Sequence, residues 1–152
     1  MTHTHGKPAI ILLAENDPGD QELTRRALEE APFQNEIHIV GDGEAALDYL
    51  FRHGKYQHPS LSPQPDLLLL DLNMPKVDGR QVFECIRADA ILRRLTVVVL
   101  TMSQREEDII CAYDLGANSY IVKPVELQPF IQVIQALEAY WFRMVVLPPL
   151  QG

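Results

Sequence analysis

The chain has 152 residues, which is the length of one domain and is enough to bury most of its apolar side chains. Its formal net charge of −8 and pI of about 5.0 argue against a strongly basic face, so we expect no binding to nucleic acid or to an anionic membrane surface. No apolar stretch reaches the length of a membrane span, and the polar residues 1–7 lack the apolar segment of a signal peptide, which predicts a cytoplasmic protein.

Apolar runs of strand length alternate along the chain with stretches whose apolar residues recur every three and four positions. This alternation is typical of βα units around a parallel sheet with helices on both faces. We therefore predict an α/β fold built from five such units. The strands are expected at residues 9–14, 37–40, 67–70, 96–100 and 118–122.

The predicted helices lie between and after these strands, and local signals mark some of their ends. Asp17 as N-cap, Pro18 at the first helical position and Asp20 in the first turn favour a helix after the first strand. A second helix is expected over residues 42–53, with Gly54 ending it in a left-handed turn, and the proline-rich residues 55–65 are expected to form a surface loop.

The later helices are recognised by their apolar periodicity. One follows Gly79, and another is marked by Ile109, Ile110, Tyr113 and Leu115 and ends before Gly116; both are expected to pack against the sheet. The last helix begins near Glu126 and leads into an unusually apolar end of the chain. That end either folds back over its own core or buries its apolar surface in a partner, because monomers seldom expose such a patch.

Polar residues follow four of the predicted strands. The first strand ends in Glu15-Asn16-Asp17, and the third, fourth and fifth end in Asp71, Thr101 and Lys123. Ligands of open α/β sheets bind at the carboxyl ends of the strands, so these groups are expected to converge. Crowded carboxylates resist ionisation unless they share a cation, and Lys123 and Thr101 suit phosphoryl oxygens. The sequence therefore indicates magnesium-dependent phosphate chemistry.

Each of these residues also has an ordinary structural interpretation. Asp71 could cap the loop after its strand, Thr101 could be a β-branched strand residue, and Lys123 could be a solvated lysine before a turn. Tyr120 is a residue type that is more often part of a core. Only the joint order of the set favours the functional interpretation over these alternatives.

The ordered set Glu15-Asn16, Asp71, Thr101 and Lys123-Pro124, together with the run from Asp71 to Pro75, resembles the receiver domain of two-component response regulators. The resemblance implies the flavodoxin-like (CheY-like) doubly wound sheet with strand order 2-1-3-4-5. It further implies that Asp71 accepts a phosphoryl group from the phosphohistidine of a sensor histidine kinase, while Lys123 binds one phosphoryl oxygen. Thr101 and Tyr120 are then the switch residues that report phosphorylation to the surface. Such a protein assists its own phosphorylation and dephosphorylation and is not otherwise an enzyme.

The resemblance implies a Mg²⁺ ion held by Asp71, by the backbone carbonyl of Asn73 and by the acidic residues after the first strand. The family usually presents two adjacent carboxylates there, but this chain has Glu15 followed by Asn16. An amide supplies no charge, so either Asn16 binds the metal weakly or Asp17 takes its place. Asp17 can also be explained as an N-cap alone.

The loop after the second helix and the end of the chain resemble the single-domain response regulators that partner phytochromes. This resemblance implies a phytochrome-type histidine kinase, for example a bacteriophytochrome, and a homodimer formed by the last helix and its extension. We expect a disordered tail over residues 1–8, a receiver domain over 9–143 and an apolar extension over 144–152. The residues expected at the dimer interface are Tyr140, Trp141, Phe142, Val145, Val146 and Leu147.

Other classes of protein fit less well. A flavodoxin-like electron carrier needs a phosphate-binding loop rich in glycine, serine or threonine after its first strand, where this chain has carboxylates. A haloacid-dehalogenase-type phosphatase needs a second aspartate where this chain has Asn73. The remaining alternative is a pseudo-receiver, which keeps the fold as a protein-binding module without being phosphorylated, and the reason to consider it is Asn16.

Overall fold

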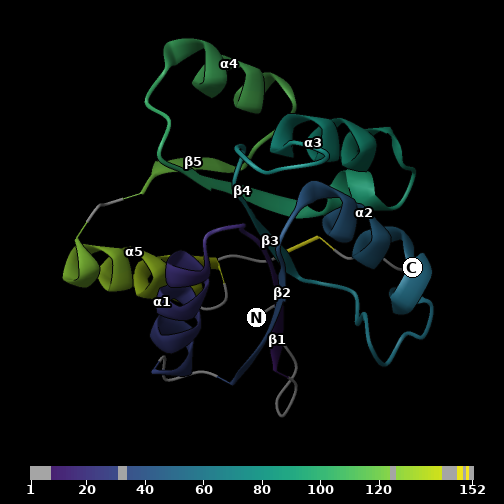
Figure 1. Cartoon of the computed structure of the whole chain (residues 1–152), viewed down its shortest axis with the longest axis horizontal. Coiled ribbons are helices and arrows are strands. Elements are labelled where there is room, and N and C mark those ends of the chain that lie inside the picture. Colours follow the sequence, from purple (N-terminus) through teal and green to yellow (C-terminus); the bar gives the residue numbers. More distant parts are fainter. Residues whose placement is uncertain (1–7, 31–33, 124–125, 142–146, 149, 151–152) are drawn as a thin grey trace.

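The described residues form one parallel five-stranded sheet with helices on both faces (Figure 1). The structure is a computed structural model that describes residues 8–30, 34–123, 126–141, 147–148 and 150. The strand order is β2-β1-β3-β4-β5, which confirms the predicted fold class and topology. The strands are β1 Ala9–Ala14, β2 Asn35–Val40, β3 Leu67–Leu70, β4 Thr96–Thr101 and β5 Ser119–Val122.

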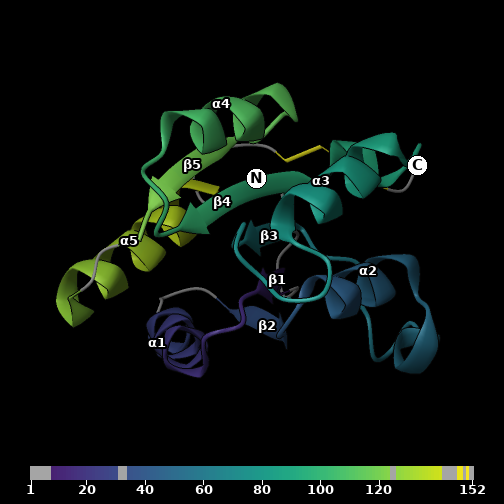
Figure 2. The ribbon, with the colours of Figure 1, turned by 45° about the horizontal axis from the view of Figure 1, so that its top comes forward.

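Two layers of helices cover the sheet. Figures 1 and 2 show α1 and α5 on one face and α2, α3 and α4 on the other. Each layer packs against one face of the sheet and forms a separate cluster of buried apolar side chains with it. Every residue of β3 and β4 is buried. The helices are α1 Pro18–Glu29, α2 Gly43–Phe51, α3 Gly79–Ala88, α4 Glu106–Asp114 and α5 Leu127–Ala139, and short 3-10 turns lie at Gly54–Tyr56 and Leu92–Arg94.

Side-chain caps fix where the helices near the strand ends begin. Asp17 Oδ1 accepts a hydrogen bond from Gly19 N at 3.1 Å, which is the N-cap predicted for α1. Asp78 and Gln81 form a reciprocal capping box at the start of α3. These caps set the distance between each strand end and the helix that follows, and so they shape the loops at that edge of the sheet.

The end of α2 differs from the prediction. The helix ends at Phe51, and Arg52 takes the left-handed conformation with φ of 56°. The backbone N–H of His53 donates to Asp48 O at 2.8 Å, which closes the last turn around Arg52. Gly54 is also left-handed, but it begins a 3-10 turn rather than ending the helix, so the predicted boundary was two residues late.

The expectation that the apolar residues of α4 pack against the sheet was wrong for two of them. Ile110 is 52% exposed and Tyr113 is 50% exposed. Ala112 is the buried residue that the structure assigns to this helix. A helix with one small buried residue is held weakly by packing, so α4 depends more on polar contacts than the other helices do.

The apolar end of the chain folds back over its own core where the structure describes it. Trp141 and Leu147 pack against the cluster under α1 and α5, and Leu150 packs against the opposite cluster. Arg94 Nη2 donates to Leu150 O at 3.3 Å. Of the residues predicted for the dimer interface, Phe142, Val145 and Val146 lie outside the described residues, as does most of the predicted N-terminal tail.

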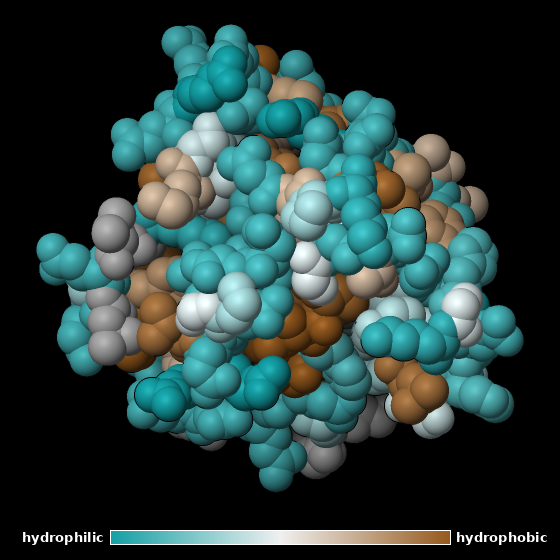
Figure 3. All heavy atoms as spheres, viewed as in Figure 1, coloured by the Kyte–Doolittle hydropathy of each residue, from teal (hydrophilic) through white to brown (hydrophobic). Residues whose placement is uncertain are grey.

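One face of the molecule shows how polar and apolar side chains are distributed at the surface. Figure 3 shows a mostly hydrophilic face, with hydrophobic side chains visible near its centre and in smaller groups toward its sides. Within the described ranges, no helix is long and apolar enough to cross a membrane.

Candidate functional site

Asp71 lies directly after β3 at the carboxyl edge of the sheet and is 7% exposed. Its backbone N–H donates to Ala14 O at 3.0 Å, which continues the pairing of β3 with β1 for one more residue. Its carboxylate Oδ1 accepts from Asn73 N at 3.0 Å, and its Oδ2 accepts from Lys123 Nζ at 3.2 Å. The strand, the following loop and the buried ammonium of Lys123 therefore all hold this carboxylate in place.

Lys123 supplies the positive charge at the centre of the site. Its backbone N–H donates to Thr101 O at 2.7 Å, so β5 delivers the residue to the same edge of the sheet. The buried ammonium contacts the carboxylates of Glu15, Asp20 and Asp71, with Asp20 Oδ2 at 2.9 Å. Burial alone would lower the pKa of Lys123, but the hydrogen bonds to Glu15 and Asp20 and the charge of Asp71 outweigh it and raise the pKa. Lys123 is therefore charged at neutral pH.

Glu15 is the most deeply buried carboxylate of the site, at 2% exposed. Burial raises the pKa of Glu15 to about 7, while the hydrogen bond and charge of Lys123 oppose that rise and the charge of Asp71 adds to it. Glu15 Oε2 also accepts from Asp17 N at 3.1 Å. Since three carboxylates surround the single ammonium of Lys123, the site carries more acidic groups than one ammonium can neutralise.

Thr101 and Tyr120, the two predicted switch residues, are joined through Ser103. Thr101 is fully buried at the end of β4, and its Oγ1 accepts from Ser103 N at 3.4 Å. Tyr120 is half-buried, and its hydroxyl donates to Ser103 O at 3.0 Å. Burial raises the pKa of Tyr120, so its hydroxyl is protonated at neutral pH. A displacement of Thr101 would therefore be felt at Tyr120 through one loop residue.

A polar network that the sequence did not reveal ties this loop to α3 and α4. Asp108 Oδ2 accepts from Ser103 Oγ at 2.6 Å, and its Oδ1 accepts from Arg80 Nη1 at 2.8 Å. The network thus links the start of α3, the first turn of α4 and the loop that holds Thr101. Because α4 buries so little apolar surface, these bonds are a large part of what positions it.

The structure separates the candidates for the remaining metal ligand. Asn16 and Asp17 are both exposed, and Asp17 is occupied as the cap of α1. Asp20, which the sequence suggested only as a helix-dipole residue, instead reaches Lys123. It is the third helical residue of α1, and helical side chains point back toward the N-terminus, which is the signal that could have identified it.

The donor set fits a small divalent cation. The edge of the sheet offers carboxylate oxygens from Asp71, Glu15 and Asp20, which are the hard ligands that Mg²⁺ and Mn²⁺ prefer. Among the described residues, no three acidic, histidine or cysteine side chains form a ready-made metal cage.

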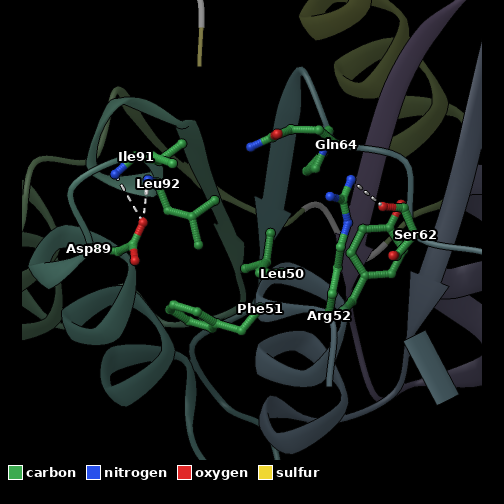
Figure 4. Close-up of a pocket in the computed structure, with 10 residues that line it drawn as sticks. Leu50, Phe51, Arg52, Ser62, Gln64, Asp89, Ile91 and Leu92 are labelled. Atoms are coloured by element: carbon green, nitrogen blue, oxygen red, sulfur yellow. Dashed lines mark hydrogen bonds between the residues drawn. The ribbon is translucent and has the colours of Figure 1, made fainter. Parts of the chain in front are cut away.

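A pocket of about 240 Å³ lies at the opposite end of the sheet, between the end of α2 and the start of β3 (Figure 4). Its charged side chains already have partners: Asp89 accepts from the backbone of Ile91 and Leu92, and Arg52 donates to Ser62 O at 3.4 Å. It contains none of the predicted site residues. This pocket therefore does not take part in the chemistry expected at Asp71.

Comparison with known proteins agrees with this geometry. The family model of the response regulator receiver domain matches residues 11–135. The chain is 38% identical over 148 residues to Response regulator Rcp1 from Synechocystis sp., covering 97% of this chain and 99% of that one. A crystal structure of the Mn²⁺-bound form of Rcp1 aligns with a TM-score of 0.87 and 39% identity over 93% of this chain and 100% of the other. The phosphorylated cyanobacterial phytochrome response regulator RcpA aligns with a TM-score of 0.89 and 38% identity over 94% of this chain and 100% of the other.

Proposed function

The chain belongs to the family of response regulator receiver domains, and we propose that its Asp71 accepts a phosphoryl group from a phytochrome-type sensor histidine kinase. The observation that carries the proposal is the ion pair between Lys123 Nζ and Asp71 Oδ2, at 3.2 Å and buried at the carboxyl edge of the sheet. In this pair the Asp71 carboxylate is the nucleophile, and the Lys123 ammonium is the positive charge held beside it. The similarity to a phosphorylated phytochrome response regulator supports the choice of donor.

The proposed reaction moves one phosphoryl group between two protein side chains. An oxygen of the Asp71 carboxylate forms a bond to phosphorus as the bond from phosphorus to the histidine nitrogen of the kinase breaks, and the imidazole leaves. Charge spreads over the phosphoryl oxygens during transfer, so catalysis consists mainly of positioning and charge compensation. Water later cleaves the acyl phosphate, which releases inorganic phosphate and restores the carboxylate.

Each residue of the site has a part in this proposal. Lys123 binds a phosphoryl oxygen, and the Thr101 hydroxyl, at the end of the neighbouring strand, donates to another. A divalent cation, proposed to be Mg²⁺ and bound by Asp71, the Asn73 carbonyl and acidic groups of the β1–α1 segment, neutralises charge on the group being transferred. When the Thr101 hydroxyl turns toward the phosphoryl group, its hydrogen bond with Ser103 is lost. Tyr120 and Asp108 of α4 both bond to Ser103, so they shift, and the protein surface around α4 changes.

The alternative of a binding module that is never phosphorylated gains no support from the site. Asp71 and Lys123 form their ion pair, and Thr101 lies at the adjacent strand end, so the residues that the chemistry needs are together. We place the protein in the cytoplasm, where a sensor kinase presents its phosphohistidine. Its proposed output is a protein contact or onward phosphotransfer, since the acidic chain is unsuited to nucleic acid.

Phosphotransfer from a purified kinase tests this function. A phytochrome-type histidine kinase loaded with labelled phosphate is expected to lose its label to the chain in the presence of Mg²⁺, because the site then has its full complement of positive charge. An unrelated histidine kinase is the control and is expected to transfer on the order of tenfold or more slowly, since its docking surface is not matched. Equal rates from both kinases would refute the assignment of the donor, and no transfer from either would refute the function.

The homodimer formed through α5 and its extension remains part of the proposal. Tyr140 is 49% exposed at the end of α5, and its ring is held edge-on by Trp141 at 5.1 Å between centroids. Tyr140→Ala is expected to lower the mass measured by light scattering at low protein concentration, because interfaces concentrate their energy in buried aromatic residues. Tyr113→Ala on α4, with a similarly exposed tyrosine, is expected to leave the mass unchanged. An equal effect of the two changes would place the contact elsewhere.

A further inference from the structure

The family chemistry needs an acidic ligand near Asp71, and the position expected for it holds the amide of Asn16. Asn16 is exposed, and the neighbouring Asp17 caps α1 through its bond to Gly19 N. If Asp17 moved to a metal, the helix would lose that cap, which normally stabilises a helix measurably. Neither residue is therefore well placed to complete a cation site beside Asp71.

We propose that Asp20 supplies the missing carboxylate and binds the divalent cation together with Asp71. This inference rests on the proposed function, because that function is what requires a cation at this edge of the sheet. Asp20 comes from the first turn of α1 rather than from the residues directly after β1. The assignment makes the start of a helix, not the strand end alone, part of the metal site.

The first support is position. Asp20 Oδ2 is 2.9 Å from Lys123 Nζ, and Asp71 Oδ2 is 3.2 Å from the same atom. Both carboxylate oxygens contact the same ammonium nitrogen. The distance between them is therefore no larger than the sum of these two distances. A divalent cation with its inner-sphere waters can bridge such a gap.

The second support is the difference in exposure between the acidic groups. The Asp20 side chain is 21% exposed, whereas that of Glu15 is 2% exposed. A hydrated cation entering from solvent meets Asp20 before it meets Glu15. Mg²⁺ gives up its waters reluctantly, so a carboxylate that is partly open to solvent suits it better than one that is sealed in the core.

The third support is charge. Lys123 holds three carboxylates, so Asp20 can turn toward a cation while Glu15 and Asp71 still pair with the ammonium. No buried group is left without a partner by that movement. The cation also relieves the repulsion that one ammonium leaves among three carboxylates. The neutral amide of Asn16 carries no negative charge to offer the cation.

Titration of the full chain with Mn²⁺, followed by the electron paramagnetic resonance signal of free Mn²⁺, tests the inference. Asp20→Asn is expected to weaken Mn²⁺ binding on the order of tenfold or more, a loss typical of a damaged metal site. Glu22→Gln removes the same charge from an exposed residue of α1 that pairs with Arg26, and it is expected to change affinity by less than about twofold. Asp17→Asn is expected to match Glu22→Gln.

Two results would overturn the inference. Equal losses in Asp20→Asn and Glu22→Gln would show a general charge effect, and a large loss in Asp17→Asn alone would make Asp17 the ligand.

A measurement on the unaltered chain covers the case in which a variant does not fold. Traces of Mn²⁺ are expected to broaden the carboxyl ¹³C resonances of Asp20 and Asp71 together, before that of Glu22, since broadening falls steeply with distance from the ion. Broadening of Asp71 with Asp20 left sharp would overturn the assignment. Mn²⁺ binding without any phosphoryl transfer to the chain would instead refute the proposed function and leave Asp20 as a ligand.

Discussion

Lys123→Met is expected to lower the free energy of unfolding by roughly 3–5 kcal/mol at pH 8 in the absence of metal, because it removes the cation from a buried ion-pair cluster. Lys123 is 6% exposed and contacts three carboxylates, two of which are themselves buried. Methionine fills a similar volume, so the loss reports charge rather than packing. The remaining carboxylates then face one another without compensation.

The loss is expected to shrink at low pH. Burial already raises the pKa of Glu15 to about 7 from an unfolded value near 4.5, and loss of Lys123 removes the hydrogen bond and the positive charge that most oppose this rise. A raised pKa means that the folded chain binds more protons than the unfolded chain, so this part of the stability is present below pH 4.5 and is lost as pH rises through 7. The deficit of Lys123→Met relative to the unaltered chain should therefore grow between pH 5 and pH 8.

Urea unfolding at both pH values, with a chelator present, measures this deficit. Lys55→Met, which alters an exposed lysine near Tyr56, is the control and is expected to change stability by less than about 0.5 kcal/mol at either pH. Added Mg²⁺ should return part of the stability of Lys123→Met at pH 8, because the ion replaces the lost charge. A deficit that is the same at pH 5 and pH 8 would contradict the proposed charge balance.

Alanine at Gly43 or at Gly79 is expected to cost roughly 3 kcal/mol or more of the free energy of unfolding. A Cβ at Gly43 would lie 1.6 Å from Val77 O, and one at Gly79 would lie 2.4 Å from Asp71 O. Both neighbours are backbone atoms of the loop that follows β3. The starts of α2 and α3 thus clamp this loop from two sides, and it cannot move away without carrying Asp71 with it.

Gly19→Ala is the matched control, since Gly19 also lies in the first turn of a helix. Its Cβ would lie 3.6 Å from Asp17 Oδ1, an ordinary contact, so stability should stay within about 0.5 kcal/mol of the unaltered chain. Thermal or urea unfolding of the three variants measures the difference. Losses at Gly43 and Gly79 no larger than the loss at Gly19 would mean that the loop yields and does not fix the site.

Much of the fold could be predicted from the sequence because buried parallel strands read as unbroken apolar runs. The run before Asp71 and the run before Thr101 became β3 and β4, and their ends converge as expected. Strand order came from the resemblance rather than from periodicity. The failure in α4 has a different cause: periodicity marks apolar positions, but it does not say whether they face the sheet or the solvent. The end of α2 was placed too late because glycine is the usual left-handed residue after a helix, whereas here Arg52 takes that conformation.

The sequence predicted which residue types form the site. It did not predict the members of the site that are brought in by contacts between side chains far apart in the sequence. Lys123 and Asp71 were identified by their order along the chain, and they form an ion pair. Asp20 was seen only as a helix-dipole residue, although it reaches Lys123 across 103 positions of sequence. The bond from Arg80 to Asp108 was not predicted at all, because no local pattern records which surface charges meet after folding.

The most direct test of the account is the intact mass of the chain after incubation with acetyl phosphate and Mg²⁺, a small donor that needs no kinase surface. The account predicts the added mass of one phosphoryl group, carried by Asp71 and lost again on standing, with no addition to Asp71→Asn, whose amide is not a nucleophile at phosphorus. An unchanged mass for the unaltered chain, or an equal addition to Asp71→Asn, would contradict it.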